Sequence, residues 1–132
     1  MENACEGVKF FDAVSNEERR ELVKRVWVLV NPSVREGFGL NVIEANALGV
    51  PCIAYDVPGL RDSIQHGQTG ILIKSGGVEA LAEAIILVLK SDDLRRKLSD
   101  NALTYSKSFS WDKVAEEFMK VIRGVNGDKC KN

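Results

Sequence analysis

A run of five apolar residues, 26–30, constrains the fold of this 132-residue chain more than any other feature. The run reads Val-Trp-Val-Leu-Val and stops at Asn31 and Pro32. Its length, its β-branched side chains and the proline stop favour a strand that is buried on both faces. Strands of this kind are typical of a parallel sheet with helices on both sides.

Strand and helix patterns alternate along the first two thirds of the chain. Besides residues 26–30, short β-prone segments occur at residues 8–11, 52–55 and 70–73. Helical patterns occur at about residues 17–25, 40–48 and 78–89. Gly49 and Pro51 favour a helix end after residue 48, with Gly49 in a left-handed conformation. The alternation predicts an α/β fold, a mainly parallel sheet flanked by helices.

The remainder of the chain is expected to be helical. Ser91 and Ser110 are typical N-cap residues, and each precedes a helical pattern. The last helix is expected to bury one stripe, which consists of Trp111, Val114, Phe118, Val121 and Ile122. Residues 124–132 carry no apolar pattern and are expected to form a flexible tail. Residues 1–123 then form one domain of ordinary size.

Charge and composition exclude several classes of protein. Eighteen Lys and Arg against nineteen Asp and Glu give a net charge of −1, which lacks the basic footprint of nucleic-acid binding. The longest apolar stretch, residues 84–89, is far shorter than the roughly 20 residues of a membrane span. Cys5, Cys52 and Cys130 share no metal or redox spacing and are interpreted as reduced. Without a signal peptide, this cysteine usage predicts a cytoplasmic protein.

The segment with the clearest chemical potential is residues 36–44, Glu-Gly-Phe-Gly-Leu-Asn-Val-Ile-Glu. It follows the predicted buried strand and enters a helix, and ligands of parallel sheets bind at such junctions. Gly37 and Gly39 let the backbone approach a ligand closely. Free N–H groups at the start of the helix favour a phosphate or pyrophosphate.

Two carboxylates flank this predicted anion site. Glu36 precedes it on the loop, and Glu44 lies about one helical turn beyond it, on the face of Asn41. A nucleotide sugar fits this order, with Glu36 on sugar hydroxyls and Glu44 on the ribose diol. The alternative is that both are solvated surface acids. The helix at 40–48 is apolar at six of nine positions, so Glu44 is expected to need a partner, which favours the ligand role.

The motifs in and around this segment resemble those of the retaining glycosyltransferases of family 4, also called glycosyl transferase group 1. The matching motifs are Pro32-Ser33, Glu36-Gly37-Phe38-Gly39-Leu40, Glu44-Ala45, Gly49-Val50-Pro51, Ile53-Ala54, Pro58-Gly59-Leu60-Arg61-Asp62, Gly67-Gln68-Thr69-Gly70 and Phe109-Ser110-Trp111. The resemblance runs from about residue 8 to 122. It implies a Rossmann-like domain, part of the donor-binding half of a two-domain GT-B fold.

The resemblance also implies roles for individual residues. Glu36 would be the catalytic residue that contacts the transferred sugar, and Glu44 would bind the ribose. The donor-binding backbone would be that of Gly37, Phe38, Gly39 and Leu40. The implied reaction transfers a sugar from a nucleotide-sugar donor to an unknown acceptor with retention of configuration. The family stabilises the leaving diphosphate without a metal, so neither a metal nor a further cofactor is expected.

The chain departs from the family pattern at its start. Members of the family carry a whole acceptor-binding domain before the donor domain. Their donor domain also starts with two strand–helix units that precede the part matched by residues 8–122, and these two units supply a basic pair for the diphosphate. Asp12 stands where the family usually shows a glycine. The isolated chain is therefore expected to be inactive. The edge of residues 26–30 is expected to pair with residues 8–11, with a second copy, or with the missing N-terminal domain or chain.

Two alternatives to an active transferase stay open. One is a non-catalytic remnant or nucleotide-sugar-binding module that acts with a partner chain. The other is a nucleotide-sugar epimerase, which shares the two-domain architecture. Arg35 and Arg61 are the nearest cations in sequence and are interpreted as surface charges rather than diphosphate contacts. His66 is interpreted as a residue of a surface turn rather than a catalytic base.

Overall fold

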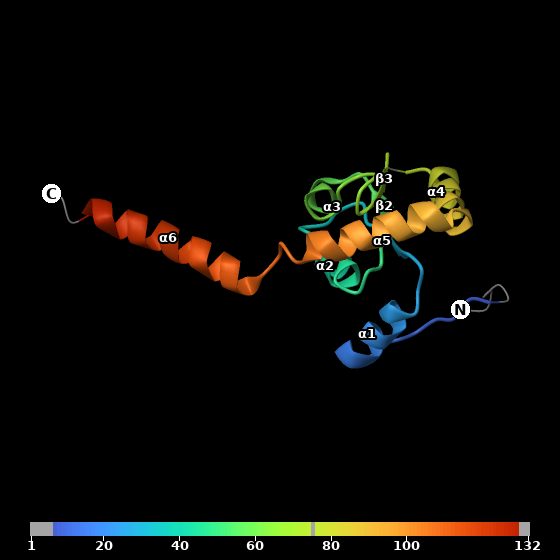
Figure 1. Ribbon diagram of the computed structural model, residues 1–132, viewed down its shortest axis with the longest axis horizontal. Helices are drawn as coiled ribbons and strands as arrows, with labels where there is room; N and C mark the ends of the chain where they lie inside the picture. Colours follow the sequence, from blue (N-terminus) through green and yellow to red (C-terminus); the bar gives the residue numbers. More distant parts are fainter. Residues whose placement is uncertain (1–6, 75, 130–132) are drawn as a thin grey trace.

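The computed structural model describes residues 7–74 and 76–129, which form three strands and six helices (Figure 1). In chain order the elements are α1 (Asn16–Lys24), β1 (Leu29–Asn31), α2 (Leu40–Asn46), β2 (Cys52–Tyr55), α3 (Pro58–Ser63), β3 (Gly70–Ile73), α4 (Val78–Lys90), α5 (Asp92–Ser106) and α6 (Trp111–Lys129). The strands are all parallel, in the order β1-β2-β3. The predicted α/β class and parallel sheet are confirmed.

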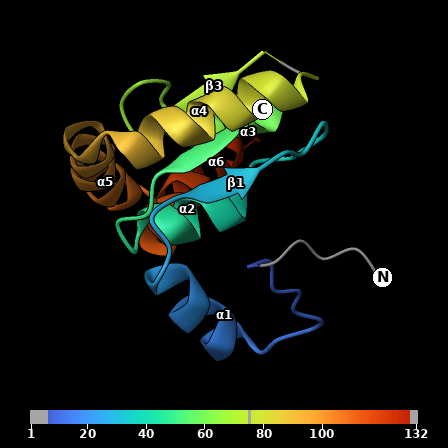
Figure 2. The ribbon, with the colours of Figure 1, turned by 90° about the vertical axis from the view of Figure 1, so that its right-hand side faces the viewer.

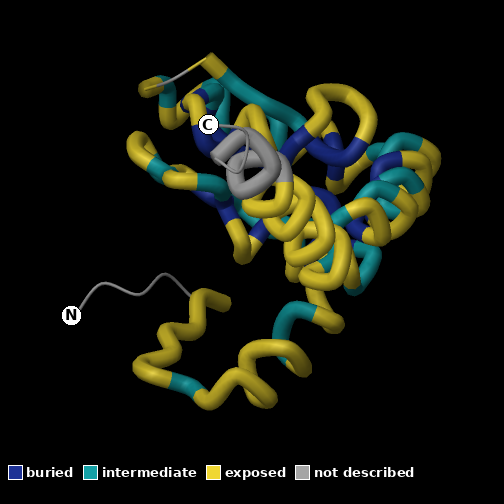
Figure 3. Tube along the Cα trace, turned by 90° about the vertical axis from the view of Figure 1, so that its left-hand side faces the viewer, coloured by how far each residue is buried: buried dark blue, intermediate teal, exposed yellow. Residues whose placement is uncertain are grey.

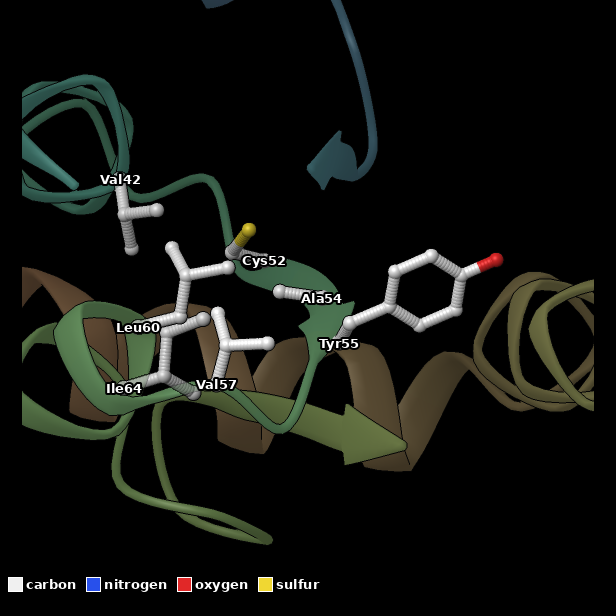
Figure 4. Close-up of a cluster of buried hydrophobic side chains, with 7 residues drawn as sticks. All are labelled: Val42, Cys52, Ala54, Tyr55, Val57, Leu60 and Ile64. Atoms are coloured by element: carbon white, nitrogen blue, oxygen red, sulfur yellow. The ribbon is translucent and has the colours of Figure 1, made fainter. Parts of the chain in front are cut away.

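Strand β2 is the centre of the fold and is buried along its whole length. Its alternate residues face opposite helical layers. Cys52 and Ala54 pack with Val42 of α2 and Leu60 of α3, and Figure 4 shows this cluster. Ile53 faces the other side, where its cluster is completed by Val88, Leu98 and neighbours on β3 and α4. The core is therefore a three-layer arrangement of helices, sheet and helices.

Local sequence signals fix the ends of several helices. Ser15 and Glu18 form a capping box at the start of α1, with Ser15 Oγ accepting from the Glu18 amide at 3.2 Å. Ser91 caps α5, as its position predicts, by accepting from the Leu94 amide. Gly49 has a φ of +74°, the predicted left-handed conformation after α2. These helix ends follow from the sequence because each depends on a single nearby side chain or glycine.

Residues 8–11 do not form the predicted strand. Val8, Phe10 and Phe11 are exposed, and the segment pairs with no strand of the described chain. The expected pairing of this segment with β1 is therefore wrong. A short β-prone segment has no hydrogen-bond partners of its own, so its propensity produces no strand unless the fold brings it beside another strand, and here residues 8–11 do not pair with the open edge of β1.

The apolar run at residues 26–30 also differs from its prediction. Only Leu29 and Val30 belong to β1, and Val26 and Trp27 are exposed. Among the described residues β1 pairs only with β2, so one edge of the strand is unpaired, as expected, but Leu29 and Val30 are only partly buried rather than buried on both faces. The ring of Trp27 lies under the guanidinium of Arg95 instead, 4.4 Å from its centre.

Helix α6 begins directly after Ser110, as predicted, but its apolar stripe is not buried. The helix extends away from the three-layer core (Figure 1). Trp111 is 82% exposed, Phe118 63% and Val121 64%. Helical spacing predicts which residues share a face, but whether that face is buried depends on a partner, and no described element covers it. The helix reaches Lys129, within the segment 124–132 for which a flexible tail is expected.

The structure bears on two expectations from the sequence, the lack of a membrane span and the reduced state of the cysteines. No helix in residues 7–74 and 76–129 is long and apolar enough to cross a membrane. Cys52 is a free, buried cysteine, and its burial raises the pKa of the thiol to about 12. The thiol is protonated at neutral pH, and the free cysteine agrees with the prediction that Cys52 is reduced. Cys5 and Cys130 lie outside the described residues.

Candidate functional site

The loop that carries residues 36–39 leaves the carboxyl end of β1 and leads into α2. Gly39 is the N-cap residue of α2, and its φ of +75° lies in the left-handed region. A Cβ at this position would lie 2.9 Å from both Leu60 Cδ2 and Ser63 Oγ. Backbone conformation and packing space therefore both require glycine here.

The start of α3, which follows the neighbouring strand β2, packs directly against this loop. A Cβ on Gly59 would lie 2.1 Å from the carbonyl oxygen of Glu36 and 2.6 Å from the carbonyl carbon of Gly37. The backbones of α3 and of the loop are thus in direct contact. Because contacts this close leave no room for adjustment, the position of the loop is fixed by the core beneath it.

Phe38 anchors the loop through its side chain. Its ring contacts the ring of Phe109 edge to face, with 5.6 Å between centroids, and Phe109 contacts Tyr105 in the same way at 5.0 Å. The Tyr105 hydroxyl donates to the carbonyl of Asp62 at 3.2 Å. The aromatic ring between the two glycines is therefore half-buried against the connection between α5 and α6, whereas Gly37 beside it is exposed.

The first turn of α2 has backbone donors to offer. The Val42 amide donates to the Gly39 carbonyl at 2.9 Å, whereas the amides of Leu40 and Asn41 donate to no acceptor in the described part of the chain. Asn31, at the end of β1, orders the same junction: its side chain donates to Asn41 Oδ1 at 3.4 Å and accepts from the Ser33 amide at 3.1 Å. Sequence reasoning did not identify Asn31, although its place at the end of a strand before Pro32 is a signal for such a turn.

Glu44 has a different environment from the one that sequence predicts. The buried face of α2 consists of Val42, Ala45 and Asn46, and the Glu44 side chain is 56% exposed on the opposite face. The argument that Glu44 is a buried acid is therefore wrong. Its carboxylate nevertheless has a protein partner, because Oε2 lies 2.9 Å from Nη2 of Arg19 on α1.

A cleft of about 590 Å³ lies between α1 and α2. Glu44 and Asn41 line it together, as their predicted common face implies. Its full lining is Asn16, Arg19, Arg20, Val23, Leu29, Asn41, Glu44, Ala45, Ala47 and Leu48. Glu36 and the loop residues Gly37, Phe38, Gly39 and Leu40 are not part of this lining. The structure therefore places Glu44 in a cleft and Glu36 on the adjoining loop, next to the start of α3.

The remaining candidates have structural roles or stay on the surface. Arg61 forms an ion pair with Asp56 and holds the pKa of that carboxyl below its usual value. His66 is exposed, as predicted, and directly precedes the turn at residues 67–69, where its Nδ1 accepts from the Leu72 amide at 3.0 Å. Arg35 and Asp12 are exposed. Within the described ranges no three His, Cys, Asp or Glu side chains come together as a metal site.

The sequence profile of the family described as "Glycosyl transferases group 1" matches residues 2–105. Among curated relatives, the D-inositol 3-phosphate glycosyltransferase of a Nocardioides species is 33% identical over 121 residues, which is 92% of this chain and 26% of that protein. An uncharacterized glycosyltransferase of Methanocaldococcus jannaschii is 34% identical over 91% of this chain and 33% of its own length.

The fold is similar to solved structures of glycosyltransferases. Sucrose-phosphate synthase from Thermosynechococcus elongatus has a TM-score of 0.83 and 30% identity, covering 91% of this chain and 30% of that one. The pneumococcal O-GlcNAc transferase GtfA, solved with UDP and GlcNAc, has a TM-score of 0.69 and 27% identity over 80% of this chain and 22% of its own. This chain thus spans about a fifth to a third of the length of the proteins it resembles.

Proposed function

This chain belongs to the group 1 glycosyl transferases, and we propose that it supplies the donor-binding half of a sugar transfer. The donor would be a nucleotide sugar, and the sugar would pass to an unknown acceptor with retention of configuration. The observation that carries the proposal is the loop of residues 36–39 after β1, called the glycine-bracketed loop because Gly37 and Gly39 flank Phe38. Glu36 lies at its start, the unpaired amides of Leu40 and Asn41 follow its end, and Glu44 lies one turn into α2.

The proposed donor lies along the outer face of this junction. The diphosphate would accept hydrogen bonds from the amides of Leu40 and Asn41, because these donors are unpaired and the helix start favours negative charge. Glu44 would accept from the ribose diol in the cleft between α1 and α2. Glu36 would accept from hydroxyls of the sugar, at the other end of the diphosphate. The proposal includes no metal and no cofactor besides the donor.

The proposed reaction breaks the bond between the anomeric carbon and the diphosphate and forms one to an acceptor oxygen. As that bond breaks, negative charge grows on the diphosphate. Backbone donors fixed by the core need no rearrangement at this moment, and such preorganised donors contribute strongly to catalysis. The contact between Gly59 and the carbonyl of Glu36 supports this role, because it holds the loop in one position.

The proposed partner is a further domain or chain, or a second copy of this chain. Relatives are three to four times as long, and the exposed stripe of α6 and the single-sided pairing of β1 are surfaces that partners commonly cover. Light scattering on the purified chain should give a mass above 14.6 kDa. A monomer that is active in transfer would contradict both the need for a partner and the expected inactivity of the isolated chain.

The donor proposal is tested by calorimetry with UDP, GDP, ADP and their sugar conjugates. Glu44→Ala should weaken binding of the preferred nucleotide by about tenfold to a hundredfold, since hydrogen bonds to a charged group contribute about 1.5–3 kcal/mol. Glu36→Ala should weaken binding of the nucleotide sugar and leave binding of the free nucleotide nearly unchanged. Equal affinity of wild type and Glu44→Ala would contradict the proposed role of Glu44.

Turnover separates the alternatives that share this site. Transfer of the sugar to an acceptor, in the presence of partner chains, supports the transferase. Binding without turnover, even with partner chains, indicates a nucleotide-sugar-binding remnant. Release of an epimerised sugar that is still attached to its nucleotide indicates an epimerase.

A further inference from the structure

The ion pair between Arg19 and Glu44 joins two helices that share few other contacts. Helix α1 contributes no buried residue, and Figure 2 shows it on the β1 side of the domain, away from α4 and α5. Glu44 Oε2 and Arg19 Nη2 are 2.9 Å apart, and both side chains line the cleft between α1 and α2. The pair therefore reaches from one wall of the cleft to the other.

Neither member of the pair is saturated by this contact. A guanidinium carries five N–H donors, and a carboxylate offers about four lone-pair positions on two oxygens. Within the described part of the chain, the only partner of either side chain is the other member of the pair. Oε1 of Glu44 and N–H groups of Arg19 are thus free to bind an uncharged group that both donates and accepts. A sugar diol is such a group.

We propose that Arg19 is a positioning residue for Glu44 and that the two side chains form one unit that binds the ribose. Oε1 of Glu44 accepts from the diol, while Arg19 holds the carboxylate in the orientation that this bond needs. This inference rests on the proposed function, because it takes the ribose of the donor as the ligand of Glu44. It adds a residue of α1 to a site that is otherwise built on α2.

Two physical arguments support this role. An exposed glutamate has several rotamers, and holding it in one of them reduces the entropy lost when the ligand binds. The cleft of about 590 Å³ is also within the range of roughly 300–1,000 Å³ that small-molecule sites occupy. Its apolar wall, made by Val23, Leu29 and Leu48, is a suitable surface for a nucleobase beside the ribose.

The alternative is that Arg19 only stabilises α1. Exposed ion pairs contribute little to folding, and both side chains of this pair are about half exposed. Arg19→Leu should therefore leave the melting temperature of the chain almost unchanged. A positioning role has a second, separate signature, because the effect of Arg19 on ligand binding must pass through Glu44.

A double-mutant cycle on the full chain measures this dependence. Calorimetry with UDP, GDP and ADP first identifies the nucleotide that binds, and Arg19→Leu, Glu44→Gln and the double variant are then titrated with it. Arg19→Leu should weaken binding about fivefold in the wild-type background and less than twofold beside Glu44→Gln, as expected for two residues in contact. The 2′-deoxy form of the same nucleotide lacks one hydroxyl of the diol. Arg19→Leu should therefore change its affinity less than twofold, both in the wild-type chain and in Glu44→Gln, which is within the usual error of additivity.

Arg20→Leu is the matched control. Arg20 is on the same helix, lines the same cleft and carries the same charge, but forms no ion pair with Glu44. Arg20→Leu should weaken nucleotide binding by the same factor in the wild-type chain and in Glu44→Gln. If Arg19→Leu behaves like Arg20→Leu, the positioning role is overturned while the proposed function stands. If the wild-type chain binds none of the three nucleotides, both are overturned.

Discussion

Two regions of the molecule differ in how far they bury their apolar side chains: the segment from β1 to α5, and the two outer helices α1 and α6. In the first, each helix packs against the sheet or a neighbouring helix, and the side chains of Ile53, Leu60 and Leu98 are almost completely buried. In the second, both helices are amphipathic, but α1 has no buried residue and α6 exposes its apolar stripe. Sequence periodicity is equally clear in the two regions.

The difference shows that periodicity specifies a helix and its faces, whereas burial depends on what the helix can meet. Helices α4 and α5 meet the sheet through short connections, so their stripes find a surface within the chain. Helix α6 extends beyond the sheet (Figure 1), and the residues of its apolar stripe are exposed. Figure 3 shows exposed residues along the helix. An exposed apolar stripe of this size is typical of a surface that contacts another protein or domain.

The largest expected effect is a contrast in stability between the two regions. Leu98→Ala should lower the free energy of unfolding by about 3 kcal/mol, because it leaves a cavity in the core. Phe118→Ala should change it by less than about 0.5 kcal/mol in the monomer, since that ring is exposed. Urea denaturation of both variants checks the contrast, and a loss of similar size in Phe118→Ala would show that α6 is packed.

A slightly smaller effect should appear at the junction between the core and the site. Gly59→Ala places a methyl group in contact with the carbonyl of Glu36, and we expect a loss of about 2–3 kcal/mol in the free energy of unfolding. Gly67→Ala is a useful comparison, because its Cβ would meet no atom within 4 Å, although its φ of +74° carries a backbone cost. Equal thermal melts for wild type and Gly59→Ala would contradict the close contact.

Asn46 offers a change in the opposite direction. Its side chain is fully buried, and neither amide atom has a hydrogen-bond partner among the described residues. Asn46→Leu keeps the branching of the side chain and removes two unpaired polar atoms, so stability should rise by about 1–2 kcal/mol. Denaturant unfolding measures the gain. The same change at exposed Asn16 should have almost no effect, and a destabilised Asn46→Leu protein would indicate a hidden polar partner.

The smallest effect concerns the surface pair of Arg61 and Asp56. Hydrogen bonding from Arg61 holds the pKa of Asp56 below its ordinary value of 3.8 in the folded chain. The contribution of the pair is therefore present above pH 3.8 and is lost as the pH falls through the lowered pKa. NMR titration should show the pKa of Asp56 rising toward 3.8 in Arg61→Gln. An unchanged pKa in that variant would contradict the pair.

The sequence predicts the core and the loop–helix junction well because their signals are local. Gly49, Ser91 and the run of residues 52–55 each specify their own conformation, and the structure agrees with all three. The predicted strand at residues 8–11 is wrong because a strand depends on a neighbour that the local sequence does not encode.

The candidate site was predictable only in part for the same reason. The glycine-bracketed loop is visible in sequence, and its place between β1 and α2 is confirmed. The exposure of Glu44 was not predictable, because apolar content alone does not tell which face of α2 is buried. Arg19 lies 25 residues away from Glu44 in sequence and reaches it only through the fold.

NMR chemical-shift mapping tests the central claim most directly, that a donor nucleotide binds where β1 leads into α2. Titration with UDP, GDP and ADP should shift the backbone amides of Gly39, Leu40 and Asn41 for at least one nucleotide, together with the amides near Glu44 and Arg19. Shifts confined to the far end of the sheet, around Trp27 and Arg95, or no shifts with any of the three nucleotides, would contradict the claim.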